Sequence, residues 1–232
     1  MKRREFLQRG LGAIAGFSAT NCFGAVAQDL PDIDLILCLD WSGSMYATLG
    51  GSKQNYIIQK EGHIAALRDS EVYQLLIYRR VYVRVILWSG YANETMPIFL
   101  GRMVSKESVE ALADAIFKKV PDTHSLSGAT THYTPLIYAN SSPIFGKKRI
   151  VDISTDEPIF EWHTSFCRSY MESIYRSSKT TVNVLAIGID APGLENLREN
   201  LQTPDGFTAS IKNWEGYIPA LKRKIMKELS II

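Results

Sequence analysis

The chain has 232 residues, of which 46% are hydrophobic and 22% charged, so the composition is that of a folded protein and excludes a disordered chain. This length is enough for one α/β domain with a sizeable core. The formal net charge is +2, and because residues 1–27 carry a net +3, the remainder stands at −1. No electrostatic field for binding nucleic acid is expected from so small a charge.

The amino terminus indicates export. The segment Arg3-Arg4-Glu5-Phe6-Leu7 resembles the twin-arginine export signal, and a mildly apolar stretch rich in Gly and Ala follows it. Ala25-Val26-Ala27 is typical of a cleavage site. We therefore expect residues 1–27 to be a twin-arginine signal peptide and residues 28–232 to be a mature, periplasmic or secreted protein. An uncleaved anchor and a lipoprotein attached through Cys22 are the alternatives, but the apolar stretch is short and the lipobox poor.

Residues 33–39 predict a central strand that ends in a polar turn. The run is apolar apart from Asp34, as is typical of a strand buried on both faces. Asp40-Trp41-Ser42-Gly43-Ser44 follows, with one carboxylate and two hydroxyls at alternate positions and a glycine that permits a sharp turn. These oxygens suit Mg²⁺, Ca²⁺ or Mn²⁺, at the strand end where open α/β sheets bind ligands. The alternative is a turn that only ends the strand and caps the next helix.

The rest of the chain alternates between helical and extended patterns. Helices are predicted at residues 53–68, 105–120, 133–140, 162–177, 194–201 and 214–229, with a short helix or turn at 71–78. Strands are predicted at residues 80–88, 96–100, 148–154, 180–189 and 207–211. The alternation predicts one α/β domain with a three-layer, doubly wound architecture. Its central sheet would be mostly parallel, with one antiparallel edge strand at 96–100 and helices on both faces.

Three segments carry a resemblance to a known family. Asp40-Trp41-Ser42-Gly43-Ser44 resembles the Asp-x-Ser-x-Ser signature of von Willebrand factor type A (vWA) domains, which forms the first loop of a metal-ion-dependent adhesion site (MIDAS). Gly128-Ala129-Thr130 resembles the second loop of that site, and Asp156, after the strand at 148–154, resembles the third. The resemblance covers about residues 32–230 and implies that the metal ligands are Asp40, Ser42, Ser44, Thr130 and Asp156.

Some residues depart from the family pattern, and others resemble one particular branch of the family. Ala129 replaces a glycine, Thr131 is the fallback for Thr130, and Glu157 stands where the family usually has Gly. The likeness is greatest to a bacterial, exported branch of the family without an assigned function. In that branch a strand ends in Trp-Ser-Gly, as at Trp88-Ser89-Gly90, and an Arg-Glu-Asn segment lies near the carboxyl terminus, as at Arg198-Glu199-Asn200.

The resemblance implies a binding module rather than an enzyme. In the family, neutral hydroxyl ligands leave a divalent cation electrophilic, so that an acidic residue of a protein partner completes its coordination. We expect Mg²⁺, or Mn²⁺ or Ca²⁺, in this role, with no nucleic acid as partner and no integral membrane segment after signal cleavage. A metal-dependent hydrolase is one alternative, although Ser42 lacks the G-x-S-x-G context and no histidine stands out as its base. A structural envelope protein with a degenerate metal site is another.

The remaining residues of interest leave alternatives open. Cys38 and Cys167 either form a disulfide or are a small core residue and a free thiol. Trp41 is either an exposed anchor for a partner or packs under its loop. His132 either lies at the rim of the site, two residues after Thr130, or is a surface histidine, and we expect the second. Lys147-Lys148-Arg149 is expected to be the solvated start of a strand. Asp152 is expected at an internal position of the sheet, and Trp88 and Trp214 in the core.

Overall fold

The computed structural model describes residues 30–46, 54–90, 95–121 and 130–230. They form a six-stranded sheet in the order β3-β2-β1-β4-β5-β6, in which β3 is antiparallel to β2 and the other pairs are parallel. The strands are β1 (Ile33–Asp40), β2 (Tyr82–Trp88), β3 (Thr95–Arg102), β4 (Lys148–Thr155), β5 (Thr181–Ile187) and β6 (Thr208–Ile211). The predicted mostly parallel sheet with one antiparallel edge strand is therefore confirmed.

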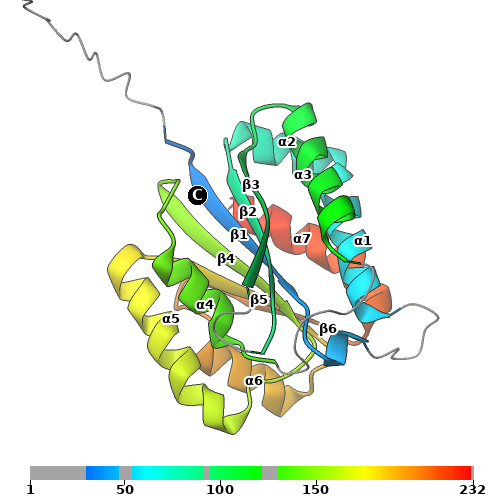
Figure 1. Ribbon diagram of the computed structural model, residues 1–232. Helices are drawn as coiled ribbons and strands as arrows, with labels where there is room; N and C mark the ends of the chain where they lie inside the picture. Colours follow the sequence, from blue (N-terminus) through cyan, green and yellow to red (C-terminus); the bar gives the residue numbers. More distant parts are fainter. Residues whose placement is uncertain (1–29, 47–53, 91–94, 122–129, 231–232) are drawn as a thin grey trace, which may run out of the picture.

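Helices cover both faces of the sheet (Figure 1). One layer contains α1 (Asn55–Arg68), α2 (Ser70–Tyr78), α3 (Lys106–Lys119) and α7 (Tyr217–Ser230). The other contains α4 (Tyr133–Ser141), α5 (Thr164–Ser178) and α6 (Ala191–Asn200). Short 3-10 helices lie at η1 (Ser44–Tyr46), η2 (Glu161–His163) and η3 (Trp214–Gly216). Among the described helices, none is long and apolar enough to span a membrane.

The core lies on the two sides of β1, and all eight residues of this strand are buried. Leu35, Leu37 and Leu39 belong to the apolar cluster beneath α1, α3 and α7. Ile36 and Cys38 belong to the cluster beneath α4, α5 and α6. Because side chains alternate along a strand, a sheet with helices on both faces needs an apolar run without polar alternation. This explains why the run at residues 33–39 is continuous except at Asp34.

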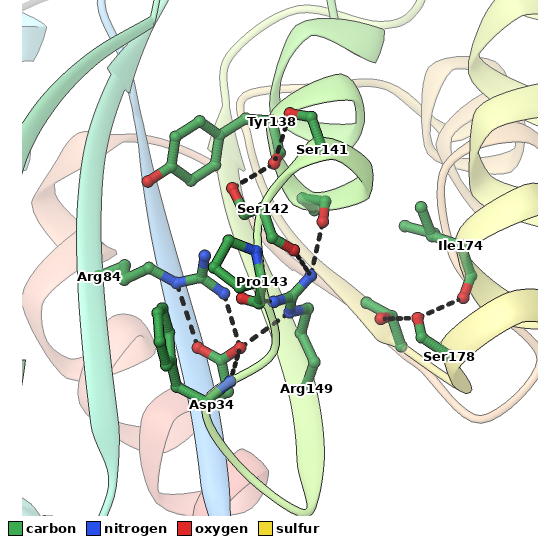
Figure 2. A network of polar contacts seen from close by, with 12 residues as sticks. Asp34, Arg84, Tyr138, Ser141, Ser142, Pro143, Arg149, Ile174 and Ser178 are labelled. Carbon is green, nitrogen blue, oxygen red and sulfur yellow. Dashed lines mark hydrogen bonds and ion pairs between the residues drawn. The ribbon is translucent and has the colours of Figure 1, made fainter. Parts of the chain in front are cut away.

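A buried ion-pair network accounts for Asp34. Arg84 on β2 donates to Asp34 through Nε at 3.1 Å and Nη2 at 2.6 Å, and Arg149 on β4 donates through Nε at 2.9 Å. The Arg149 guanidinium also donates to the carbonyl of Ala139 in α4 and to those of Ser142 and Pro143 just after that helix (Figure 2). Arg149 is only 3% exposed, so the prediction of a solvated strand start is wrong at this residue. Arg149 lies opposite Asp34 in the pairing of β1 with β4, and Arg84 on β2 lies opposite Ile36, two residues along the same face of the sheet.

Local sequence sets the start of α3 as predicted. Ser105 caps α3, since its hydroxyl accepts from the Ser108 amide at 3.4 Å while the Ser108 hydroxyl accepts from the Ser105 amide at 3.0 Å. This is a capping box in which serine replaces the more usual Glu. The strand predicted at 180–189 ends earlier, because Gly188 adopts a φ of 69° after Ile187.

Candidate metal centre

The polar turn after β1 brings two hydroxyls together. The Trp41 amide donates to the Trp88 carbonyl at 2.8 Å, which continues the pairing of β1 with β2 by one residue. The Ser42 amide then donates to Asp40 Oδ1 at 2.8 Å, and this bond closes the turn. As a result, the Ser42 and Ser44 hydroxyl oxygens lie 3.1 Å apart at the carboxyl edge of the sheet. The first predicted loop thus presents its two hydroxyls to one point.

The loop after β4 contributes Asp156 to the same point. The Ser44 hydroxyl donates to Asp156 Oδ1 at 2.7 Å, although the two residues are 112 positions apart in the chain. Asn55, at the start of α1, donates to Asp156 Oδ2 at 3.4 Å. Hydrogen bonds therefore connect Asp40, Ser42, Ser44 and Asp156, which are four of the five predicted ligands.

Thr130 reaches this edge through its two neighbours. Thr131 Oγ1 donates to the Gly90 carbonyl just beyond β2, and His132 Nε2 lies 3.0 Å from Thr155 Oγ1 at the end of β4. Since β2 and β4 flank β1, these contacts place the segment across the end of β1. Thr130 is 3% exposed, and within the described part of the chain its hydroxyl makes no hydrogen bond to the other four residues. Gly128 and Ala129 lie outside the described residues.

Within the described ranges, the two carboxylates of the cluster, Asp40 and Asp156, form no ion pair. Asp40 is fully buried, and its Oδ2 atom has no hydrogen-bond partner in the part of the chain that the structure describes. Burial, and then the charge of Asp156, raise the pKa of Asp40 well above its usual range, against the hydrogen bonds from Ser42. Burial also raises the pKa of Asp156, against the hydrogen bond from Ser44, and Glu157 raises it further. A cation bound between the two loops would offset the electrostatic repulsion that helps to raise the pKa values of Asp40 and Asp156.

The donor set fits a hard divalent cation. Adjacent ligands of an octahedral ion with bonds of about 2.1 Å lie about 3.0 Å apart. The Ser42 and Ser44 oxygens, 3.1 Å apart, match that separation. Across the described ranges, no group of three or more His, Cys, Asp and Glu side chains could hold a metal ion, so a site here would depend on hydroxyls. Hydroxyl and carboxylate oxygens favour Mg²⁺, Mn²⁺ or Ca²⁺.

Two amide side chains that the sequence did not single out support the site from α1. Gln59 accepts from the Asp40 amide at 3.1 Å and donates to the Asp40 carbonyl at 2.7 Å, so it pairs with the last residue of β1 as a neighbouring strand would. Asn55, which binds Asp156, lies one helical turn before Gln59. In the sequence, only their four-residue spacing indicates that Asn55 and Gln59 share a helix face, and this spacing does not predict that they bind Asp156 and Asp40.

The structure also decides other open predictions. Trp41 is fully buried and its ring meets that of Tyr56 at 4.9 Å, so it packs under the loop rather than serving as an exposed anchor. His132 is buried too, so the prediction of a surface histidine is wrong. Its Nε2 atom lies 3.0 Å from the Glu157 carbonyl, which ties the second loop to the third. Burial lowers the pKa of His132 to about 4, so this contact involves the neutral ring.

Cysteine and tryptophan positions complete the comparison with the sequence. Cys38 and Cys167 are both free and buried, so the possible disulfide is absent between these two described residues. Asp152 is internal to the sheet, and Trp88 and Trp214 lie in the core, as predicted. Cys22 and the whole of residues 1–27 lie outside the described residues.

The sheet order, the antiparallel strand at one edge and the Asp-x-Ser-x-Ser turn after β1 are those of the vWA fold. Solved structures of this fold match most of the chain. A vWA protein from Catenulispora acidiphila is 14% identical over 86% of this chain and 43% of its own, with a TM-score of 0.56. The pilus adhesin SpaC from Lactobacillus rhamnosus GG is 15% identical over 87% of this chain and 31% of its own, with a TM-score of 0.60.

A third structure is the proximal thread matrix protein 1 of the mussel byssus with a zinc-occupied MIDAS motif. It is 16% identical over 86% of this chain and 46% of its own, with a TM-score of 0.58. The chain spans less than half the length of each of these three proteins, and the likeness is one of fold.

The particular family follows from the sequence. Residues 30–232 match the family described as "Protein of unknown function (DUF1194)", and the chain belongs to that family. No curated protein matches the chain.

Proposed function

We propose that this protein is an exported binding module that holds a divalent cation at a MIDAS-type site and uses it to engage an acidic residue of a protein partner. Ser42, Ser44 and Thr130 would supply neutral hydroxyl ligands, and Asp40 and Asp156 would orient metal-bound water. A cation held mainly by neutral oxygens keeps its attraction for an external carboxylate. The protein's own residues would position the cation and leave one side of it open to the partner.

One observation carries this proposal: a continuous set of hydrogen bonds joins the turn after β1 to the loop after β4. It runs from Asp40 through Ser42 and Ser44 to Asp156, with a buried Asp40 oxygen left over. A turn that only ended β1 would need no second carboxylate from a loop more than a hundred residues away. The mussel matrix protein with a zinc-occupied MIDAS motif supports the choice of a divalent cation, and the SpaC adhesin supports a role in binding.

Calorimetric titration of the purified protein with Mg²⁺ and Mn²⁺ tests the metal site. We expect saturable binding to the native protein and its loss in Ser42→Ala and Thr130→Ala. Binding should also raise the melting temperature, because an ion that binds only the folded state stabilises it by about 2.7 kcal/mol at a hundredfold excess over Kd. Ser210→Ala, an exposed serine on β6, is the matched control and should bind as the native protein does.

Two results would separate the alternatives. No binding at millimolar metal would favour a structural envelope protein with a degenerate metal site. This alternative is considered because Glu157 follows Asp156 where the family usually has Gly. Turnover of an ester or phosphate substrate that is lost in Asp40→Asn would favour a metal-dependent hydrolase.

Export is tested separately by replacing Arg3 and Arg4 with lysine in the full-length precursor. A twin-arginine signal requires the arginine pair, so we expect the variant precursor to remain in the cytoplasm while the native chain is cleaved and exported. Immunoblotting of cytoplasmic and periplasmic fractions measures this. Export of the Lys-Lys variant at the native level would rule out the twin-arginine signal.

A further inference from the structure

The connection from β4 to α5, together with the first turn of α5, carries three exposed aromatic side chains within seven residues. Phe160 is 43% exposed, Trp162 70% and Phe166 54%, and we call these three residues the aromatic patch. The Phe160 and Trp162 rings are stacked at 6.3 Å. Phe166 packs on Tyr133 at 5.6 Å, and Tyr133 in turn meets His163 at 5.1 Å. Exposed aromatic side chains that gather in this way are typical of interaction surfaces.

The backbone that presents the aromatic patch is fixed on both sides. The Ile159 amide donates to Asn196 Oδ1 on α6 at 2.9 Å, and the Ile159 side chain is buried. The His163 amide donates to the Phe160 carbonyl at 2.8 Å, and His163 is only 3% exposed. Since the aromatic side chains remain exposed on a fixed backbone, a partner that covers them loses little conformational entropy in ordering them.

The aromatic patch is close to the candidate metal centre. Asp156 and Trp162 are six residues apart in one connection, so their Cα atoms are separated by at most about 21 Å. His132 ties the same connection to the second metal loop through the Glu157 carbonyl. A short segment of a partner could therefore reach both places at once.

Two acidic side chains lie in the same segment of the chain as the aromatic patch. Glu157 and Glu161 form no ion pair within the described part of the chain, and no cation lies over the three rings there. Arg168, the first basic residue after Glu161, donates to Asn200 on α6 at 3.0 Å. Exposed ring faces beside free carboxylates are the environment that a guanidinium or ammonium group prefers.

We propose that the aromatic patch binds a basic side chain, Arg or Lys, on the same protein segment whose acidic residue completes the metal site. Only the part of this inference that concerns the partner's acidic residue rests on the proposed function. The cation would stack on Trp162 and pair with Glu161 or Glu157. Because an extended residue spans about 3.3 Å, the acidic and basic residues of the partner would be no more than about six positions apart.

Selection from a random peptide library displayed on phage, with the full purified protein and Mg²⁺, tests the proposal. We expect selected peptides to combine Asp or Glu with Arg or Lys within that spacing. Their affinity should fall about tenfold in Trp162→Ala and in Glu161→Gln, as loss of a partly desolvated cation–π contact or charge pair predicts. The controls are Phe117→Ala and Glu110→Gln on α3, in the opposite helix layer, which should bind normally.

The outcomes separate this inference from the proposed function. Selection on Ser42→Ala should abolish the preference for acidic residues but keep that for basic ones. If native protein shows the basic preference without an acidic one, the metal-dependent function fails and the aromatic patch remains. The proposal is overturned if no enrichment of Arg or Lys is found, or if selected peptides bind Trp162→Ala as tightly as native protein. Dimerisation that is lost in Trp162→Ala would assign the patch to a second copy of the chain and also overturn it.

Discussion

Two buried aspartates on β1 stand in opposite electrostatic surroundings. Asp34 accepts from two guanidinium groups, so this region of the interior carries an excess of one positive charge. At Asp40, at the other end of the strand, burial raises the pKa most and the negative charge of Asp156 raises it further. Both residues are fully buried, and a buried carboxylate without a counter-charge is costly. The contrast indicates that Asp34 has a structural role, whereas a bound cation would supply the counter-charge of Asp40.

Replacing Asp34 by Asn should destabilise the fold strongly. Two buried guanidinium groups would lose their common counter-charge, and removal of one partner from a buried ion pair costs about 3–5 kcal/mol. Asp32→Asn is the matched control, because Asp32 lies two residues earlier and its ion pairs with Arg80 and Lys147 are partly exposed. We expect that control to cost less than about 1 kcal/mol. Urea denaturation measures both, and similar losses in the two variants would contradict this account.

The packing of α1 against α7 explains a glycine that weakens the helix prediction at residues 53–68. A Cβ atom at Gly62 would lie 2.6 Å from Cδ1 of Tyr217, which is too close for two carbon atoms. The glycine is therefore required by the neighbouring helix rather than by the backbone of its own. On the far side of this contact, the Tyr217 hydroxyl donates to Ser154 on β4 at 3.2 Å.

Gly62→Ala should consequently lower stability, although alanine is the better helix former by about 1 kcal/mol. We expect a net loss of about 1–3 kcal/mol from overpacking against the Tyr217 ring. In the double variant with Tyr217→Ala, the additional cost of Gly62→Ala should vanish, and denaturation of the four proteins in this cycle measures the coupling. A single Gly62→Ala variant that is more stable than the native protein would show that the helices separate freely.

A buried triad joins α7 to the sheet and should make stability depend on pH. Lys224 Nζ lies 2.5 Å from Asp152 Oδ1 and 2.6 Å from Glu228 Oε1, and Asn183 on β5 also donates to Glu228 at 3.0 Å. Burial, followed by the charge of Asp152, raises the pKa of Glu228 to about 8 against the opposing effect of Lys224. The folded state therefore holds a proton on Glu228 that the unfolded chain releases at a lower pH.

The sign of the pH effect follows from this shift. Because the folded protein binds the extra proton, the stabilisation from Glu228 is complete below the ordinary glutamate pKa and is lost as pH rises to about 8. We expect the free energy of unfolding to fall more between pH 5 and pH 8 in the native protein than in Glu228→Gln. Urea denaturation at both pH values measures the difference, and parallel pH profiles would show that Glu228 is ionised in the folded state.

At the scale of the whole molecule, the alternation of strands and helices was sufficient to predict a doubly wound α/β domain with a mostly parallel sheet, and the motifs at its strand ends suggested the vWA fold. Most strands are short runs rich in branched residues, and a local stop follows several elements, such as Pro121 after α3 and Gly188 after β5. The candidate site could be predicted as far as its motifs reached, since Ser42, Ser44 and Asp156 meet as expected. What failed were predictions that depend on long-range partners. Arg149 is buried because it pairs with Asp34 on the neighbouring strand. His132 is buried because it lies between the two loops that it connects.

The most direct test of the metal centre is anomalous diffraction from crystals of the mature protein grown with Mn²⁺. The account predicts one anomalous peak within direct coordination distance of the Ser42 and Ser44 hydroxyls, with Thr130 beside it and Asp40 and Asp156 reached through water. No peak there at saturating Mn²⁺, in a lattice that leaves this edge of the sheet open, would contradict it.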